Sequence, residues 1–293
     1  MVSIVKRKRN NRTFYYLQHK IRNQKRQKEI YLGKEIPQDI EKIKYNFLLD
    51  FYREDWISKL ELIQKNYKKT RTKIPKSAQK KEIEEFSVRF TYNTQKIEGS
   101  TLTLRETADL IMDGITPSNK PASDMVETSI HQKLFLQIIM QKKQDMSLGT
   151  ILSWHKSLFS ETKSDIAGNL RDFEVRIGGS KFIPPKPEAV PVLLKGFFTW
   201  YKKNQRKLNP VELAALVHLK FVTIHPFGDG NGRISRLMMN YVLNRFGYPM
   251  FDIEYTDRRS YYTALERSSV KNNDIVFLQW FMKRYLKAFH NFL

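Results

Sequence analysis

Apolar residues follow a helical spacing through most of this chain. Between residues 38 and about 67 they recur on one helical face, which predicts a long helix introduced by Pro37. From Pro75 onward the same spacing predicts a succession of shorter helices. These cover residues 78–97, 104–113, 123–142, 147–160, 189–205, 210–224, 233–246, 258–269 and 273–291. The chain is therefore expected to be mostly α-helical.

Two segments instead alternate apolar and polar residues, as strands do. Residues 3–34 mix basic side chains with Tyr, Phe and Ile, which predicts a small antiparallel hairpin closed by a turn at Gly33. A second hairpin is predicted over residues 174–183, where Val175 and Ile177 alternate before a Gly-Gly turn. An isolated hairpin is only marginally stable, so we expect this one to lie on the helical body.

The change of pattern near residue 75 predicts two domains. Residues 1–75 are expected to form a basic N-terminal hairpin and a long helix, to which the sequence assigns no role. Residues 76–293 are expected to form a helical domain that carries the second hairpin. The expected fold class is mostly α: a helical bundle with one short β-hairpin, preceded by the small basic hairpin and the helix.

Charge is distributed unevenly along the chain. The 293 residues contain 52 Lys and Arg against 30 Asp and Glu, a formal net charge of +22. Residues 1–34 hold eleven basic residues and a single acid, Glu29, and residues 65–81 hold eight basic residues and no acid. Such runs favour polyanions or acidic partners, although a solvated surface explains them as well. Nucleic acid is therefore one candidate partner of residues 1–34.

Composition also excludes several classes of protein. The chain contains no cysteine, which rules out a disulfide framework and a thiolate metal site. No run of 18 or more apolar residues occurs, so no membrane-spanning helix is predicted, and the N-terminus lacks the apolar core of a secretory signal. We expect a soluble cytoplasmic protein without a membrane partner.

The stretch HPFGDGNGRISR, residues 225–236, connects two strongly apolar helical patterns. Three glycines in five residues let its backbone approach a ligand closely. The amides of residues 230–233 lie at the start of the second predicted helix, where N–H groups and the helix dipole attract anions. Arg233 and Arg236 share one face of that first turn, so two guanidinium groups border the amides. The pattern predicts an oligophosphate site.

Two further residues of the stretch add chemistry to this anion site. Asp229 offers a hard oxygen ligand, and Mg²⁺ is commonly held by one or two carboxylates together with substrate phosphates. His225 can be neutral at physiological pH and can then take a proton from an attacking hydroxyl. A base, a metal ligand, an anion site and arginines are the parts needed for phosphoryl-type transfer.

Other interpretations of the stretch fit less well. A Walker A loop is excluded because no Gly-Lys-Ser/Thr precedes the helix. A calcium loop is excluded because Arg233, Ile234 and Asn240 stand where a ligand, a glycine and a glutamate are needed. A purely structural turn between helices remains, but it would not require a His, an Asp, an Asn and two Arg in fixed places.

These residues resemble the signature of the Fic family (filamentation induced by cAMP), His-Pro-Phe-x-Asp/Glu-Gly-Asn-Gly-Arg-x-x-Arg. Every specified position is present, and a motif with nine fixed positions is highly specific. The resemblance covers a core of about residues 85–270, supported by residues 171–191 and 257–266, and leaves residues 1–75 outside. It implies that residues 76–293 form a Fic domain that includes an inhibitory helix. Such a domain transfers AMP from ATP to a hydroxyl side chain of a protein.

The resemblance assigns roles to individual residues. It implies that His225 is the general base and that Asp229 holds Mg²⁺, with Mn²⁺ as an alternative ion. The phosphates of ATP would be bound at Gly230, Asn231, Gly232, Arg233 and Arg236. The hairpin looks like the family's flap, which holds the target segment as an added strand through Val175, Arg176, Ile177 and Gly178. The adenine pocket of related enzymes lies where this chain has Tyr261 and Tyr262, although paired tyrosines on a helix are also common in a core.

A second motif bears on regulation. TQKIEG, residues 94–99, matches the family's inhibitory motif Ser/Thr-x-x-x-Glu-Gly/Asn. Glu98 is expected near a helix C-terminus, where the dipole disfavours an acid unless a cation pairs with it. In the family that cation is the last arginine of the signature, here Arg236, so the resemblance implies a pair that blocks the γ-phosphate site. Considered without the family, Glu98 would be a surface acid.

Several alternatives remain open at the level of sequence. Some family members with this glutamate remove AMP from a modified protein, and Glu98 would then orient a water molecule. Residues 1–34 and 65–81 also suit a nucleic-acid-binding or scaffold protein, because a basic segment rich in tyrosine favours base stacking. His155 and His218 lie in apolar helical patterns and are expected to be packed. The implied partners are a protein bearing a Ser, Thr or Tyr hydroxyl, including this chain itself, and a second copy in a homodimer.

Overall fold

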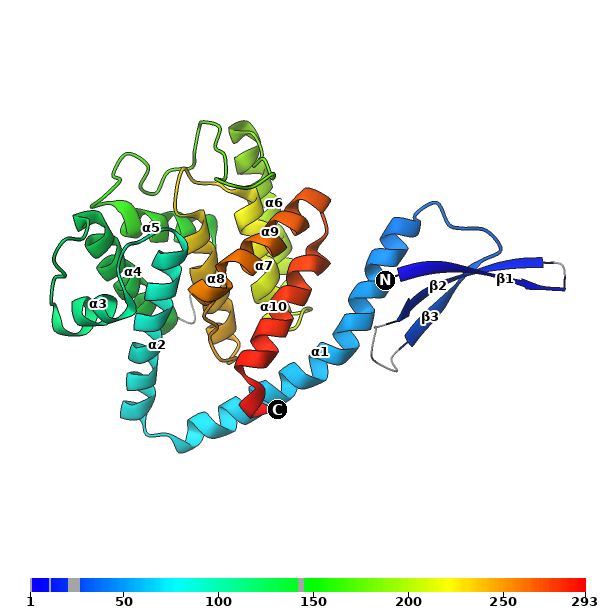
Figure 1. Cartoon of the computed structure of the whole chain (residues 1–293), viewed down its shortest axis with the longest axis horizontal. Coiled ribbons are helices and arrows are strands. Elements are labelled where there is room, and N and C mark those ends of the chain that lie inside the picture. The colour runs from blue at the N-terminus through cyan, green and yellow to red at the C-terminus, as the bar shows by residue number, and fades with distance from the viewer. Residues whose placement is uncertain (1, 11, 21–26, 142–144) are drawn as a thin grey trace. The chain divides into compact units, whose positions relative to one another are not determined.

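The computed structural model describes residues 2–10, 12–20, 27–141 and 145–293, and it divides into two compact units. Met1–Glu61 form the first unit and Leu62–Leu293 the second (Figure 1). The boundary lies inside one long helix, α1 (Ile40–Lys73), whereas the sequence pattern placed it after residue 75. Because the helix runs continuously through the boundary, neither its apolar spacing nor its composition marks the change.

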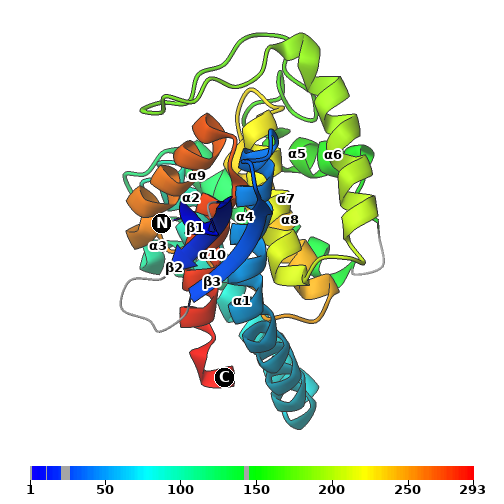
Figure 2. The ribbon, with the colours of Figure 1, turned by 90° about the vertical axis from the view of Figure 1, so that its right-hand side faces the viewer.

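The first unit contains a three-stranded antiparallel sheet, in the order β1–β2–β3, and the first part of α1 (Figure 2). The strands are β1 (Val2–Arg9), β2 (Arg12–Lys20) and β3 (Gln27–Gly33). Leu17 pairs with Ile4 and Ile30 across the sheet and is fully buried. His19, on the same face, packs edge-on against Phe51 of α1, with 4.7 Å between ring centroids. This face of the sheet therefore covers the helix.

The basic hairpin expected in residues 3–34 is present, and it carries a third strand that the sequence pattern did not separate. The additional turn lies at Asn10, whose φ of +48° is in the left-handed region that asparagine tolerates. Gly33 ends β3 instead of closing the hairpin. The connection between β2 and β3, residues 21–26, lies outside the described residues.

The second unit is helical, as the spacing of apolar residues predicts. Its helices are α2 (Lys76–Ile97), α3 (Leu104–Ala108), α4 (Ala122–Met140), α5 (Leu148–Phe159), α6 (Val190–Asn204), α7 (Pro210–Ile224), α8 (Asn231–Arg245), α9 (Arg258–Lys271) and α10 (Asp274–Ala288). Short turns of helix are η1 (Asp109–Asp113), η2 (Pro187–Ala189), η3 (Tyr255–Asp257) and η4 (His290–Phe292). Among the described residues, no helix combines the length and apolar character needed to cross a membrane.

Helices α7 and α8 pack against each other at the centre of this unit (Figure 1). Helix α7 is largely apolar and 11 of its 15 residues are buried, as expected for a helix enclosed by others. Helices α6 and α10 pack on α7, and α4 and α5 pack on α8. Buried helices therefore hold both ends of the loop that contains the signature.

The segment between α5 and α6 differs from the predicted hairpin. Residues 174–183, all of them described, reverse direction at the two glycines as expected, but no strand forms there. The Arg171 guanidinium lies between the two arms and donates to the carbonyls of Phe173 (3.1 Å) and Pro185 (2.5 Å). These bonds stand in place of a β-ladder. The expected β-hairpin is therefore corrected to a turn with two arms that do not pair.

Candidate active site

Two residues with left-handed backbone conformation shape the loop between α7 and α8. His225 ends α7 with a φ of +52°, and Gly230 precedes α8 with a φ of +78°. Gly230 also lies against the ring of Phe159, where a Cβ atom would collide, so two independent constraints require glycine here. A positive φ is uncommon in residues other than glycine, and where it occurs it is often found at functional sites. The left-handed backbone conformation of His225 therefore marks it as a candidate functional residue.

Asn231 and His155 hold this loop from inside. The Asn231 side chain accepts from the Phe227 amide at 2.9 Å and donates to the Phe227 carbonyl at 2.8 Å. The Phe227 ring stacks on His155, with 3.8 Å between centroids. Because His155 Nδ1 accepts from the Gly168 amide, its Nε2–H donates to the Asp229 carbonyl at 3.1 Å. Burial lowers the pKa of His155 to about 4, so a neutral, packed histidine supports the loop, as the sequence predicts.

His225 lies in the wall of a cleft beside this loop. Its Nδ1 lies 3.3 Å from the Val222 carbonyl and donates to it, which leaves the Nε2 lone pair as the proton acceptor. Burial lowers the pKa of His225 below its ordinary value, so the imidazole is neutral at neutral pH. A neutral imidazole in a cleft is able to accept a proton from a bound hydroxyl.

Arg171 positions His225 from outside the signature. The side chain is buried, and its Nε donates to the His225 carbonyl at 2.8 Å. The Arg171 amide donates to the Pro226 carbonyl at 3.0 Å. Together with its bonds to both arms of the flap, these contacts join the flap to His225 through one residue. Arg171 could not be singled out from sequence, because nothing in its local pattern separates it from the many solvated arginines of this chain.

We expect Arg171→Ala to lower the melting temperature of the protein by about 5–10 °C. The change removes several buried hydrogen bonds from a charged donor, a loss of about 2–4 kcal/mol. Circular dichroism against temperature measures the effect. The matched control is Arg176→Ala, on the same segment but exposed, which should leave melting nearly unchanged. Equal melting of the two variants would contradict the structural role of Arg171.

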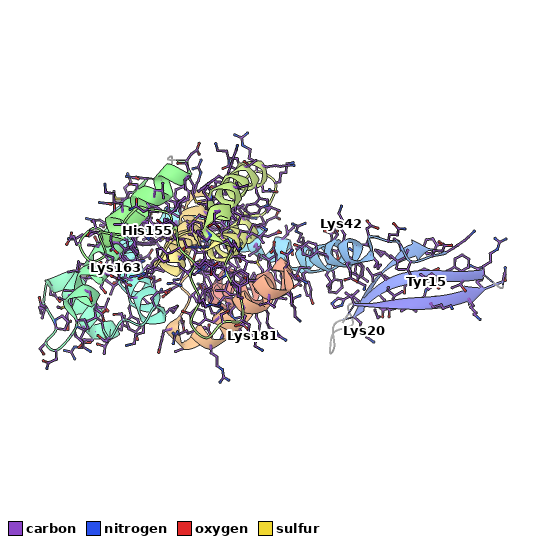
Figure 3. The ribbon with its side chains drawn as sticks, turned by 90° about the horizontal axis from the view of Figure 1, so that it is seen from above. Tyr15, Lys20, Lys42, His155, Lys163 and Lys181 are labelled. Atoms are coloured by element: carbon purple, nitrogen blue, oxygen red, sulfur yellow. The ribbon has the colours of Figure 1, made fainter. Side chains whose placement is uncertain are left out.

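Asp229 presents an ionised carboxylate at the edge of the cleft. Burial opposes its ionisation, but Arg233 and Lys163 together lower its pKa to about 2. Its Oδ2 accepts from Lys163 Nζ at 2.6 Å and from Arg233 Nη2 at 3.2 Å (Figure 3 labels Lys163). The described residues contain no group of three or more His, Asp or Glu that could hold a metal ion. A single carboxylate suits Mg²⁺ when phosphates and water supply the remaining ligands.

The Arg233 side chain is hydrogen-bonded to other side chains of the protein. Its buried guanidinium donates to Glu127 and to Gln95 (3.3 Å) as well as to Asp229, and Lys163 pairs with Glu127 at 3.3 Å. The side chains of Arg233, Lys163, Glu127 and Asp229 all border a small polar cavity of about 190 Å³. Glu127 and Lys163 were missed from sequence, because a single charge outside a motif resembles a solvated one. Arg233 thus lies in the wall of this cavity, while Arg236 lies in the larger cleft.

Glu98 and Arg236 form the ion pair that the resemblance to the Fic family implies. Glu98 Oε1 lies 2.5 Å from Arg236 Nη2, and the arginine is buried. Thr94 and Tyr261 add hydrogen bonds to the guanidinium at 3.3 Å each. Burial opposes the charged form, but Glu98 raises the pKa of Arg236 above its ordinary value. Glu98 Oε1 also lies over Gly232, where a Cβ atom would collide, so the carboxylate covers the first turn of α8.

A cleft of about 430 Å³ brings most of the predicted residues together. Its walls come from the flap, the signature loop, the end of α2 and α9. The predicted residues that line it are Glu98, Arg176, Ile177, Gly178, His225, Asp229, Gly230, Asn231, Gly232, Arg236, Tyr261 and Tyr262. Val175, although described, is not part of this lining. The cleft has the size of a small-molecule site and combines a base, a carboxylate and a cation.

The two tyrosines of α9 contribute differently to this cleft. Tyr261 is almost fully buried, and its hydroxyl lies 2.9 Å from His218 Nε2. Tyr262 is 38% exposed, and its hydroxyl donates to the Ile97 carbonyl at 3.2 Å. Arg258 lies over the Tyr262 ring at 5.2 Å. Tyr261 thus holds Arg236 from the core, while Tyr262 presents an accessible ring. The packed His218 agrees with the expectation from sequence.

Comparison with known proteins relates the chain to one family. Residues 145–243 match the model of the Fic/DOC family. A "Protein adenylyltransferase Fic" of Nematostella vectensis is 31% identical over 194 residues, which cover 65% of this chain and 45% of that protein. The protein of that name from Aedes aegypti is 32% identical over 193 residues, covering 64% and 38%. This chain thus spans less than half the length of these curated relatives.

Solved structures share the fold. A Fic-domain-containing signalling protein from Bacteroides thetaiotaomicron has a TM-score of 0.72 at 27% identity, covering 79% of this chain and 95% of that one. Fic-1 of Caenorhabditis elegans has a TM-score of 0.72 at 22% identity, covering 89% of this chain and 78% of that one. The complete signature lies within residues 145–243, and the fold agrees with the match of these residues to the model of the Fic/DOC family.

Proposed function

We propose that this chain transfers AMP from ATP to a hydroxyl side chain of a protein, and that Glu98 restrains the reaction. The observation that carries the proposal is the Glu98–Arg236 ion pair, because it lies in the same cleft as the neutral base His225. The names of the relatives, which are protein adenylyltransferases, support the type of reaction.

The residues of the cleft divide the chemistry among them. His225 takes the proton of the attacking hydroxyl, whose oxygen bonds to the α-phosphorus of ATP. The bond from that phosphorus to the bridging oxygen breaks, and pyrophosphate leaves. The amides at the start of α8 and Arg236 bind the phosphates, and Tyr262 offers its ring to the adenine. Asp229 holds Mg²⁺, which neutralises phosphate charge when it is bound.

Restraint follows from competition for one cation. Arg236 is held by Glu98 at 2.5 Å, and the same guanidinium is the natural partner of a terminal phosphate. ATP must therefore displace the carboxylate or bind without this contact. Because Glu98 also covers Gly232, the carboxylate repels a phosphate approaching the first turn of α8.

Removal of AMP from a modified protein is the second candidate. The observation that favours it is that Glu98 lines the cleft that also contains His225, where a carboxylate could orient a water molecule. Release of AMP from a pre-modified protein by the unchanged chain, lost in Glu98→Gly, would support removal.

Incubation of Glu98→Gly with labelled ATP and Mg²⁺ tests the main proposal. Label attached to a protein hydroxyl supports it, and the double variant Glu98→Gly/His225→Ala should attach none. If Glu98→Gly neither binds ATP nor transfers label to any protein of a lysate or to itself, the proposal is wrong.

A further inference from the structure

The two faces of the N-terminal sheet present different side chains. One face carries the buried Leu17 and His19, and His19 packs against Phe51 of α1, as described above. The opposite face carries three aromatic rings in contact: Tyr31 lies 5.3 Å from Tyr16 and 6.2 Å from Phe14, measured between centroids. Tyr31 is 54% exposed, so these rings do not complete a core. We call Phe14, Tyr16 and Tyr31 the aromatic face.

Basic residues border the aromatic face. The Arg7 guanidinium lies 4.6 Å above the Tyr16 ring and pairs with Glu29 at 2.6 Å. Beyond this pair, the end of the sheet where β1 meets β2 exposes three further basic residues, Lys8, Arg9 and Arg12. Arg9 and Arg12 pair with each other and lie on the aromatic face, whereas Lys8 lies on the opposite face. Within the described ranges of the chain, no carboxylate pairs with any of these three. Positive charge beside the rings therefore remains available to a polyanion.

We propose that the aromatic face binds single-stranded nucleic acid. Exposed planar rings stack on bases of any sequence, and guanidinium and ammonium groups pair with phosphates. A duplex hides the faces of its bases, so the rings favour an unpaired strand. An acidic protein would use the charges but would gain much less from the rings. This inference concerns the first unit alone and is independent of AMP transfer in the second.

Binding of the full chain to fluorescently labelled oligo(dT) and oligo(rU), about 15 nucleotides long, tests the proposal by anisotropy. We expect binding at about 50 mM salt that weakens steeply toward about 200 mM. Tyr31→Ala should weaken binding about tenfold, since stacking contributes about 1–3 kcal/mol per base. Stronger binding of oligo(rU) would identify RNA as the ligand, and equal or stronger binding of oligo(dT) would include DNA.

Two further variants separate this surface from general positive charge. Arg9→Glu/Arg12→Glu should weaken binding at least about tenfold and flatten its salt dependence. Lys80→Glu/Lys81→Glu changes the net charge equally, on α2 of the other unit, and should leave binding within about twofold. Tyr31 is largely exposed, so Tyr31→Ala should retain the fold and, combined with Glu98→Gly, the rate of AMP transfer.

Three results would overturn the proposal. They are no binding of either oligonucleotide at low salt, unchanged binding by Tyr31→Ala, and equal competition by poly-glutamate at matched charge. The last result would assign the surface to acidic polypeptides. None of these binding experiments measures AMP transfer. This proposal and the proposed function can therefore fail independently of each other.

Discussion

Glu98→Gly is expected to increase AMP transfer at least about 100-fold over the unchanged chain. Breaking a buried ion pair costs about 3–5 kcal/mol, and each 1.4 kcal/mol corresponds to about tenfold. The Glu98 side chain is 26% exposed, so the lower end of that range applies. ATP no longer has to displace a carboxylate in the variant, and Arg236 stays in place because Thr94 and Tyr261 still bind it. Initial rates with labelled ATP and Mg²⁺ measure the increase.

The same variant should melt at a lower temperature than the unchanged chain. Removal of Glu98 leaves the buried charge of Arg236 without its carboxylate, which destabilises the folded state. Addition of ATP and Mg²⁺ should restore part of the loss, because a ligand that binds only the folded state stabilises it. The unchanged chain should respond less to ATP. A thermal shift assay on both proteins therefore tests the competition for Arg236 without any transfer step.

Glu85→Gly provides the matched control, because it removes an exposed glutamate from α2, the helix that Glu98 caps at its C-terminal end. Its transfer rate should stay at the level of the unchanged chain, although glycine inside a helix costs about 1 kcal/mol. If Glu85→Gly and Glu98→Gly increased AMP transfer equally, the increase would come from destabilisation of α2 and not from loss of the ion pair. An inactive Glu98→Gly that binds ATP normally would show that the ion pair is not the restraint.

Much of the fold could be predicted because local patterns and packing agree. Helix α7 begins where Asn209 caps it and Pro210 occupies its first turn, and both signals are visible in the sequence. The signature loop was predictable because its residues are contiguous. The Glu98–Arg236 pair joins residues far apart in sequence, and no spacing rule relates them. Only the resemblance to a family connected the two motifs.

The unpredicted features depend on contacts between distant segments. Arg171 bonds to the loop after α7 and to both arms of the flap, so its role exists only in three dimensions. The same holds for Lys163 and Glu127, whose charges meet Asp229 and Arg233 only after the helices pack. The prediction of a β-hairpin in the flap was wrong for a related reason. Alternation of apolar and polar residues predicts only an extended chain. A β-ladder forms between two extended arms only where no other group binds their backbone carbonyls.

His225→Ala, made in the Glu98→Gly background, should lower AMP transfer by about 10²–10⁴-fold while ATP binding stays within a few fold. The variant loses the acceptor of the hydroxyl proton, but the amides of α8 and Arg236 still bind the phosphates. His290→Ala is the matched control, because this histidine is exposed near the C-terminus and should leave the rate unchanged. Retention of more than about a tenth of the rate by His225→Ala would exclude it as the base.

The pH dependence of transfer provides a second, independent test of the same residue. The base acts in its neutral form, and burial disfavours the imidazolium, so the pKa of His225 is lowered. The rate in Glu98→Gly should therefore remain high as pH falls through the ordinary range of histidine, and it should decline only below that range. A decline that begins above pH of about 7 would mean that a group other than His225 titrates. Because the neighbouring Asp229 stays ionised down to about pH 2, its titration cannot produce such an early decline.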